Sequence, residues 1–222
     1  MTDKIYDVII FGVTGFTGKL AVEYLLKKDD SSLKWAACAR CESRAMATLK
    51  EIADSVDKPA PTLVIADLIC QTAEDETKLR NIVASTKVVI TAAGPFEKYG
   101  ITLHKLCAEE GVHYADITGE TSFFRHVIDQ HDDKARTSKA TLVSHCGNDC
   151  IPQDLTVFEM DKYAKSKGCK VRSIAIRRSL LTFLSLFRVK FIFTVPTYFA
   201  IFFGFTSSRK LRPWICFLPR QL

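Results

Sequence analysis

The last part of this chain lacks acidic residues. Residues 162–222 contain 13 of the 31 lysines and arginines and none of the 25 aspartates and glutamates, so they carry +13, whereas residues 1–161 carry 18 − 25 = −7. Nine of the 15 phenylalanines also follow residue 180. The net charge of +6 therefore combines two physically different segments.

The chain also lacks the features of a secreted or metal-binding protein. It opens on polar residues with only a short apolar run behind them, so no secretory signal is expected. The eight cysteines are scattered; Cys38 and Cys41 form one C-x-x-C pair, but no second pair stands at zinc-ribbon spacing. We therefore expect reduced thiols in the cytoplasm, no metal site and no nucleic-acid partner, and nothing in the sequence indicates an oligomeric state.

No uncharged run is long enough for a simple membrane-spanning helix. The stretch 191–205 has 15 residues, whereas a spanning helix needs about 20; counting from Leu180 gives the length but includes Arg188 and Lys190. The sequence leaves three possibilities for this segment: a spanning or re-entrant helix, an interfacial segment, or a core strand. Because basic residues flank the run, we expect residues 180–222 to contact an anionic membrane surface. The alternative is an apolar segment that would join a missing domain.

Short apolar runs alternate with helical patterns through the earlier part of the chain. The expected strands are 7–12, 34–40, 62–66, 87–93, 112–116, 140–145 and 170–176. The expected helices between them are 19–28, 43–56, 74–85, 101–110, 120–138 and 152–164. Apolar strands that alternate with helices indicate a parallel sheet covered on both faces. The predicted fold class is therefore α/β, a Rossmann-type doubly wound parallel sheet formed by residues 1–165.

A glycine-rich turn follows the first expected strand. Residues 12–18 read GVTGFTG, and a helix is expected directly after them. In this setting the backbone N–H groups at the helix N-terminus bind a pyrophosphate. The spacing differs from the usual G-x-G-x-x-G, and glycines also occur in ordinary tight turns. The flanking elements favour dinucleotide binding, for which the predicted residues are Gly12, Thr14, Gly15, Phe16, Thr17 and Gly18.

Basic residues stand where the second strand ends. Arg40 lies 22 residues after Gly18, where NAD-specific folds place an acid on the ribose hydroxyl and an arginine accommodates the 2′-phosphate of NADP. Ser43 and Arg44 follow, so two guanidinium groups and a hydroxyl can converge on one phosphate. The alternative is a pair of solvated arginines at a helix start. We predict NADP rather than NAD as the cofactor.

Two further strand ends are candidates for the same site. Asp67 ends the third strand, where it would either bind the adenine amine or cap the next segment. The fourth strand leads into Ala93, Gly94 and Pro95, small residues that let the backbone approach the ribose and nicotinamide. This loop is therefore predicted to form the floor of the nicotinamide site.

No catalytic residue is predicted. After the fifth strand, Asp116 and Glu120 would position a substrate amine or hydroxyl, but a helix-capping role is favoured for Glu120. The five histidines occupy mostly helix or strand positions. Tyr99 is not followed, four residues on, by the lysine of a short-chain dehydrogenase.

Several segments together carry a family resemblance. They are FGVTGFTG near the N-terminus, AR-x-x-SR at the second strand end, TAAGPFEKYG, HYADITGE and GNDCIPQDL, and they span most of residues 5–160. This set resembles the saccharopine dehydrogenase-like oxidoreductases. The resemblance implies a Rossmann NADP-binding domain followed by an α+β substrate domain. It also implies association with lipid droplets, mitochondria or other membranes, and kinship to enzymes of glycolipid synthesis that reduce enoyl intermediates.

The resemblance fades after Ile176, where apolar, basic sequence replaces the expected substrate domain. We therefore expect a truncated or alternatively spliced product, in which residues 166–179 begin the substrate domain and residues 180–222 form a tail on the cytoplasmic side of a membrane. The resemblance implies an NADP-dependent oxidoreductase linked to lipid or glycolipid metabolism. The alternative is a non-catalytic NADP(H)-binding sensor or membrane-associated scaffold.

Overall fold

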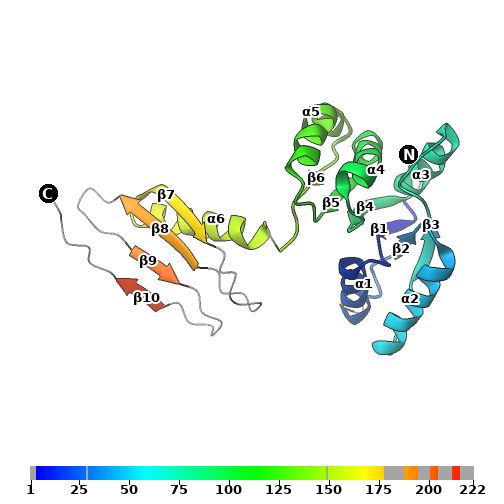
Figure 1. The fold of residues 1–222 in the computed structure, drawn as a ribbon, viewed down its shortest axis with the longest axis horizontal. Helices are drawn as coiled ribbons and strands as arrows, with labels where there is room; N and C mark the ends of the chain where they lie inside the picture. The colour runs from blue at the N-terminus through cyan, green and yellow to red at the C-terminus, as the bar shows by residue number, and fades with distance from the viewer. Residues whose placement is uncertain are drawn as a thin grey trace. The chain divides into compact units, whose positions relative to one another are not determined.

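The structure, a computed structural model, contains two compact units, residues 1–149 and 150–222 (Figure 1). It describes residues 4–28, 30–148, 150–177, 188–194, 201–204 and 212–215. Among these residues, no helix combines the length and the apolar character needed to cross a membrane. The domain boundaries at residues 165 and 179 stay predictions.

The first unit is built around a six-stranded parallel sheet. Its strands are β1 (Tyr6–Phe11), β2 (Trp35–Ala39), β3 (Thr62–Ile65), β4 (Thr86–Thr91), β5 (His113–Asp116) and β6 (Leu142–Val143). They follow the order β3-β2-β1-β4-β5-β6, which is the strand order of the Rossmann fold. At the centre, Ile9 of β1 pairs with Ala36 of β2 and Val89 of β4. The predicted α/β class and doubly wound sheet are confirmed.

Helices cover both faces of this sheet. They are α1 (Phe16–Lys28), α2 (Glu42–Ser55), α3 (Ala73–Ala84), α4 (Phe96–Glu110) and α5 (Thr121–Ser138). Ile9 and Phe11 of β1 pack in one buried cluster with residues of α3 and α4, whereas Ile10 packs in another with residues of α1 and α2. Because neighbouring strand residues point to opposite faces, a strand buried on both faces must be apolar throughout.

Helix α4 begins at Phe96, earlier than the predicted start at residue 101. Pro95 is its N-cap residue, and Gly100 lies inside the helix, where glycine usually costs stability. Packing explains this glycine, since a Cβ at residue 100 would lie 2.9 Å from the ring of Phe123 on α5. Gly100 therefore marks a close contact between two helices rather than a loop.

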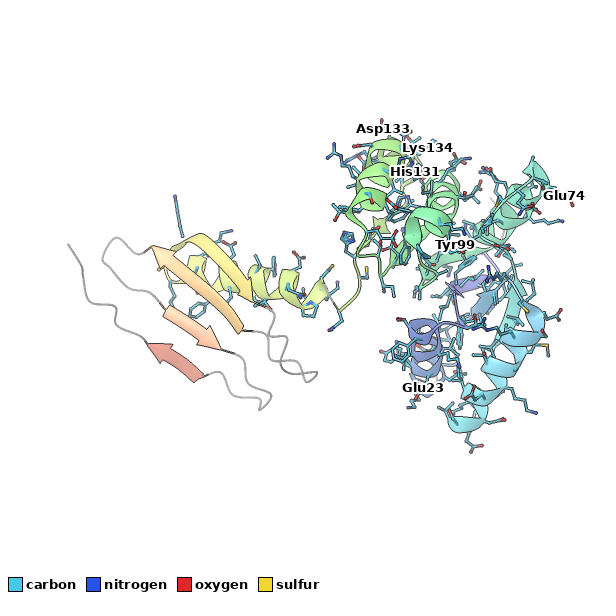
Figure 2. The ribbon with its side chains drawn as sticks, viewed as in Figure 1. Glu23, Glu74, Tyr99, His131, Asp133 and Lys134 are labelled. Atoms are coloured by element: carbon cyan, nitrogen blue, oxygen red, sulfur yellow. The ribbon has the colours of Figure 1, made fainter. Side chains whose placement is uncertain are left out.

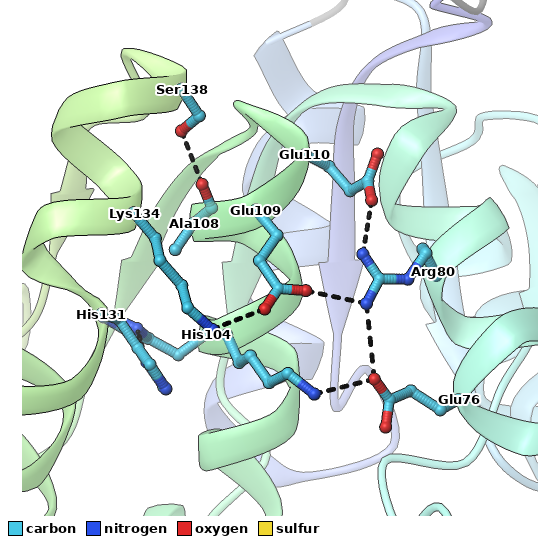
Figure 3. A network of polar contacts seen from close by, with 10 residues as sticks. Glu76, Arg80, His104, Ala108, Glu109, Glu110, His131, Lys134 and Ser138 are labelled. Carbon is cyan, nitrogen blue, oxygen red and sulfur yellow. Dashed lines mark hydrogen bonds and ion pairs between the residues drawn. The ribbon is translucent and has the colours of Figure 1, made fainter. Parts of the chain in front are cut away.

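Charged side chains join α3, α4 and α5 in one network (Figure 3). Arg80 of α3 donates to Glu110 at 2.6 Å and to Glu109 at 2.8 Å, and Lys134 of α5 lies 2.7 Å from Glu109. Partial burial raises the pKa of Glu109, but the hydrogen bonds from Lys134 and Arg80 outweigh it and lower the pKa to about 2. Shared, partly buried ion pairs of this kind contribute more than isolated surface pairs, so the network helps to fix the three helices.

The second unit contains α6 (Ile151–Ser166), β7 (Lys170–Arg177), β8 (Arg188–Thr194), β9 (Ile201–Gly204) and β10 (Arg212–Ile215). β7 pairs with β8 and β9 with β10, both antiparallel. β7 corresponds to the strand predicted at residues 170–176. Much of the predicted tail at residues 180–222 lies outside the described residues, and its contact with a membrane stays a prediction.

Candidate cofactor-binding site

A cavity of about 260 Å³ opens at the carboxyl ends of β1 to β4. Open α/β sheets bind ligands at this edge, where the strand order reverses. Seven of the predicted residues line the cavity: Gly12, Thr14, Gly15, Arg40, Asp67, Ala93 and Gly94. Pockets for whole ligands usually measure roughly 300–1,000 Å³, so this cavity suits part of a dinucleotide.

The other six predicted residues do not line the cavity. Phe16, Thr17 and Gly18 form the first turn of α1, Ser43 and Arg44 lie in the first turn of α2, and Pro95 precedes α4. Phe16, Thr17, Ser43 and Arg44 are exposed, whereas Gly18 is buried. The exposed residues are therefore accessible to a ligand that extends beyond the cavity.

The glycine turn is shaped by close backbone contacts. Gly12 has a φ of +82°, and a Cβ there would lie 2.8 Å from the backbone nitrogen of Ala93. A Cβ at Gly18 would lie 2.1 Å from the carbonyl oxygen of Gly12. At Gly15, by contrast, a Cβ would meet no atom closer than 3.4 Å. Protein packing therefore requires glycine at residues 12 and 18, while the glycine at residue 15 leaves room in the cavity lining.

Two helix N-termini beside the cavity have no side-chain cap. α1 follows Gly15, which has no side chain to serve as a cap, and Cys41, the N-cap residue of α2, makes no side-chain capping bond. In contrast, Thr72 and Asp75 form a capping box at α3. Unpaired N–H groups at a helix N-terminus attract anions, so α1 and α2 offer two places for phosphate groups.

Arg40 and Arg44 add positive charge at the second of these places. Both are exposed, and no carboxylate in the part of the chain that the structure describes forms an ion pair with either. Between them, Ser43 Oγ lies 3.5 Å from Cys41 Sγ, and this hydrogen bond lowers the pKa of the Cys41 thiol. The two guanidinium groups are thus available to an anion.

Asp67 both lines the cavity and closes a turn. Its Oδ1 accepts a hydrogen bond from Ile69 N at 3.0 Å, the i to i+2 pattern of an Asx-turn. This bond corresponds to the capping alternative considered from the sequence. Contact between Asp67 and an adenine amine stays a prediction.

Tyr99 lines the cavity, although the sequence did not indicate it as a site residue. Figure 2 labels its side chain. It is the fourth residue of α4, and Lys98 Nζ lies 5.3 Å from its ring centroid. Pro95 followed by Glu97 is the signal that could have located this helix start and so placed Tyr99 beside Gly94. The remaining lining residues, also unpredicted, are Phe11, Cys38, Ala39, Ala66, Leu68 and Ala92.

The two carboxylates after β5 bind protein donors. Asp116, 1% exposed, accepts hydrogen bonds from Thr118 N at 2.9 Å, Ser144 Oγ at 2.9 Å and His145 N at 3.2 Å. Glu120 occupies the N-cap position of α5 but makes no capping bond there. Its two oxygens instead accept from the first two N–H groups of α4, each at 2.8 Å. Asp116 therefore connects the segments after β5 and β6, and Glu120 connects the segment after β5 with the start of α4.

Residues 8–143 match the family model of the saccharopine dehydrogenase NADP-binding domain. The chain belongs to this family. Among curated relatives, a provisionally named trans-acting enoyl reductase of Mycobacterium tuberculosis is 33% identical over 180 residues, which cover 78% of this chain and 41% of the relative. A trans-acting enoyl reductase of Mycobacterium leprae is 33% identical over 155 residues, 70% of this chain and 35% of the relative.

The fold of this saccharopine dehydrogenase-type domain also occurs in a solved structure. The apo saccharopine dehydrogenase (L-Glu forming) of Saccharomyces cerevisiae matches with a TM-score of 0.58 at 16% identity, over 76% of this chain and 33% of that chain. The predicted family and the NADP cofactor are confirmed, whereas the roles of individual site residues stay predictions. The chain spans about two fifths of the length of the first curated relative that it matches.

Proposed function

We propose that this chain binds NADP(H) as part of an oxidoreductase that reduces enoyl intermediates of lipid or glycolipid metabolism. One observation carries the binding mode: the N-termini of α1 and α2 and the Arg40 guanidinium lie at a single cavity at the carboxyl edge of the sheet. Within the described part of the chain, no side chain caps α2 and no carboxylate pairs with Arg40. The enoyl substrate class rests on the names of the mycobacterial relatives. The lipid link rests on the same names and on the motif resemblance.

In this proposal the pyrophosphate lies at the N-terminus of α1 and the 2′-phosphate lies near Arg40. Gly15 admits the pyrophosphate to the backbone because no side chain stands there. Arg40, with Ser43 and Arg44, neutralises the 2′-phosphate through charge-assisted hydrogen bonds. When bound, NADPH supplies the hydride, and the residues of the chain bind and orient it.

Calorimetry with NADPH and NADH tests this assignment. We expect the wild type to prefer NADPH, and Arg40→Ala to reduce that preference by on the order of 1.5–3 kcal/mol because one charge-assisted contact is lost. Arg136→Ala is the matched control, since Arg136 is an exposed arginine on α5 that pairs with Asp132. Equal wild-type affinities for the two cofactors would refute the Arg40 assignment, and binding of neither would refute the proposed site.

A further inference from the structure

The fold accounts for four of the five histidines. His104 and His131 share a buried hydrogen bond of 2.9 Å between their Nδ1 atoms. His113 Nδ1 accepts a bond from a backbone N–H at 3.0 Å, and His126 is exposed on α5. His145, just after β6, differs because its ring makes no hydrogen bond to any described residue.

The backbone at His145 is held in a costly conformation. Its φ is +64°, in the left-handed region. The other described non-glycine residues with positive φ, Asp57 and Lys139, lie at helix C-termini, where this conformation is usual. At His145 it is imposed by Asp116, whose Oδ1 accepts from His145 N and whose carbonyl oxygen accepts from Cys146 N at 2.8 Å. Left-handed backbone at a residue other than glycine is uncommon and clusters at functional sites.

The His145 ring is fixed on one side and open on another. It packs against Phe124 of α5, with the ring centroids 4.6 Å apart. Its Nδ1 is buried without a partner. Nε2, in contrast, is not buried without a partner, and the residue as a whole is only partly buried. Nε2 is therefore the ring nitrogen that a ligand can reach.

A series of hydrogen bonds connects His145 with the loop before α4. Asp116 Oδ1 accepts from both His145 N and Thr118 N, and Thr118 Oγ1 accepts from Glu120 N at 3.0 Å. The Glu120 carboxylate in turn accepts from Phe96 N. These bonds join the segments that follow β4, β5 and β6 at the carboxyl edge of the sheet. His145 thus lies at the carboxyl edge of the sheet, just after β6 and two strands from β4. It does not line the cavity itself, but open α/β sheets bind ligands along this edge.

We propose that His145 is a catalytic residue that protonates the α-carbon of an enoyl thioester. This proposal rests on the proposed function. In the reduction, the hydride that NADPH supplies adds to the β-carbon, the carbon–carbon double bond becomes single, and NADP+ is left. The α-carbon gains one proton from Nε2 of His145, and Nε2 regains a proton from solvent water. The expected contribution of such a general acid is 10²–10⁴-fold in rate.

The test uses the full chain with NADPH and crotonyl-coenzyme A as the probe. His145→Gln replaces the ring with an amide that cannot act as a general acid, and His126→Gln is the matched control at an exposed position. We expect wild type and both variants to bind NADPH within twofold of one another. We expect reduction of crotonyl-coenzyme A to be about 10²–10⁴-fold slower only in His145→Gln.

Chemical modification of the wild type gives a second readout that needs no variant to fold. Diethyl pyrocarbonate should modify His145 and the exposed His113 and His126. NADP+ with crotonyl-coenzyme A should protect His145 alone. Equal reduction rates in wild type and His145→Gln would overturn the role of His145 and leave the proposed function intact. Reduction of crotonyl-coenzyme A by a wild type whose His145 is not protected from modification would lead to the same conclusion. A wild type that does not bind NADPH would overturn the proposed cofactor site. Binding of NADPH without reduction or protection would overturn the enoyl substrate and His145 with it.

Discussion

Gly15 and Gly18 stand three residues apart in one turn, yet they meet different surroundings. The missing side chain of Gly18 permits contact with the Gly12 carbonyl, whereas that of Gly15 leaves space in the cavity lining. We expect Gly18→Ala to lower the free energy of unfolding by about 1–3 kcal/mol or more. Gly15→Ala should change it by less than about 1 kcal/mol but weaken NADPH binding at least tenfold. Urea denaturation and calorimetry measure the two effects.

Gly119→Ala is the control for this pair, because a Cβ there would meet nothing within 4 Å and Gly119 does not line the cavity. It should leave NADPH affinity unchanged. If Gly15→Ala binds NADPH as tightly as the wild type, the pyrophosphate does not approach this turn.

Residue-level prediction from the sequence worked where the backbone dictates the residue. Gly12 adopts a positive φ and Gly18 packs closely against the Gly12 carbonyl. Only glycine fits either position, so the residue type itself predicts the local structure. Tyr99 leaves none, because a tyrosine on a helix is equally compatible with solvent, core or cavity. Its position beside the cavity follows from the start of α4 at Phe96, five residues before the predicted start.

At the scale of elements, Glu120 stabilises α4 from outside that helix. Glu120→Ala leaves the N–H groups of Phe96 and Glu97 without their acceptors, and we expect a loss of about 1–2 kcal/mol in the free energy of unfolding. Glu97→Ala, an exposed change in the first turn of the same helix, should cost less than about 0.5 kcal/mol. Urea denaturation compares the two, and equal losses would contradict the capping role. The sequence predicted that Glu120 caps the helix that follows it. It did not predict that Glu120 caps α4, because the hydrogen bond to Phe96 N spans 24 residues.

The buried histidine pair between α4 and α5 predicts acid sensitivity. Burial lowers the pKa of His104 to about 3 and that of His131 to about 4, whereas an unfolded histidine has a pKa of about 6.5. The unfolded chain therefore binds more protons below pH 6.5, so stability is complete above that pH and falls as the pH drops toward 4.

We expect a loss on the order of 3–6 kcal/mol between pH 7 and pH 4 from this pair. Urea denaturation as a function of pH measures it. A variant with His104→Phe and His131→Leu should lose less stability over the same range, while His126→Gln should keep the wild-type slope. Parallel pH profiles for the double variant and the wild type would show that the pair does not control acid stability.

At the scale of the whole molecule, we propose that residues 180–222 contact an anionic membrane from the cytoplasmic side. The support is the sequence: 13 basic and no acidic residues after residue 161, with phenylalanines concentrated after residue 180. We expect the full chain to sediment with phosphatidylserine vesicles, less so at high salt. Changing Arg209 and Lys210 to Glu should reduce sedimentation, whereas the same change at Lys27 and Lys28 of α1 should not. Unchanged sedimentation of the Arg209 and Lys210 variant would contradict the proposal.

The two parts of the molecule differed in how well their sequences predicted structure. In residues 1–149, strands buried on both faces alternate with helices, and this pattern allows few folds. After Leu180, apolar residues are interrupted by Arg188, Lys190 and Pro196 without a period of either 2 or 3.6. Short apolar runs of this kind do not distinguish strand from helix, so β8 could not be predicted.

The carboxylate of Asp116 has a consequence for how this crevice can change. It accepts hydrogen bonds from Thr118, Ser144 and His145. These bonds couple the positions of the loops after β5 and β6. A substitution in either loop that altered these bonds would displace the other. Redesign of this domain for a new substrate would therefore have to vary both loops together, whereas Arg40 could be exchanged independently of them to alter the cofactor.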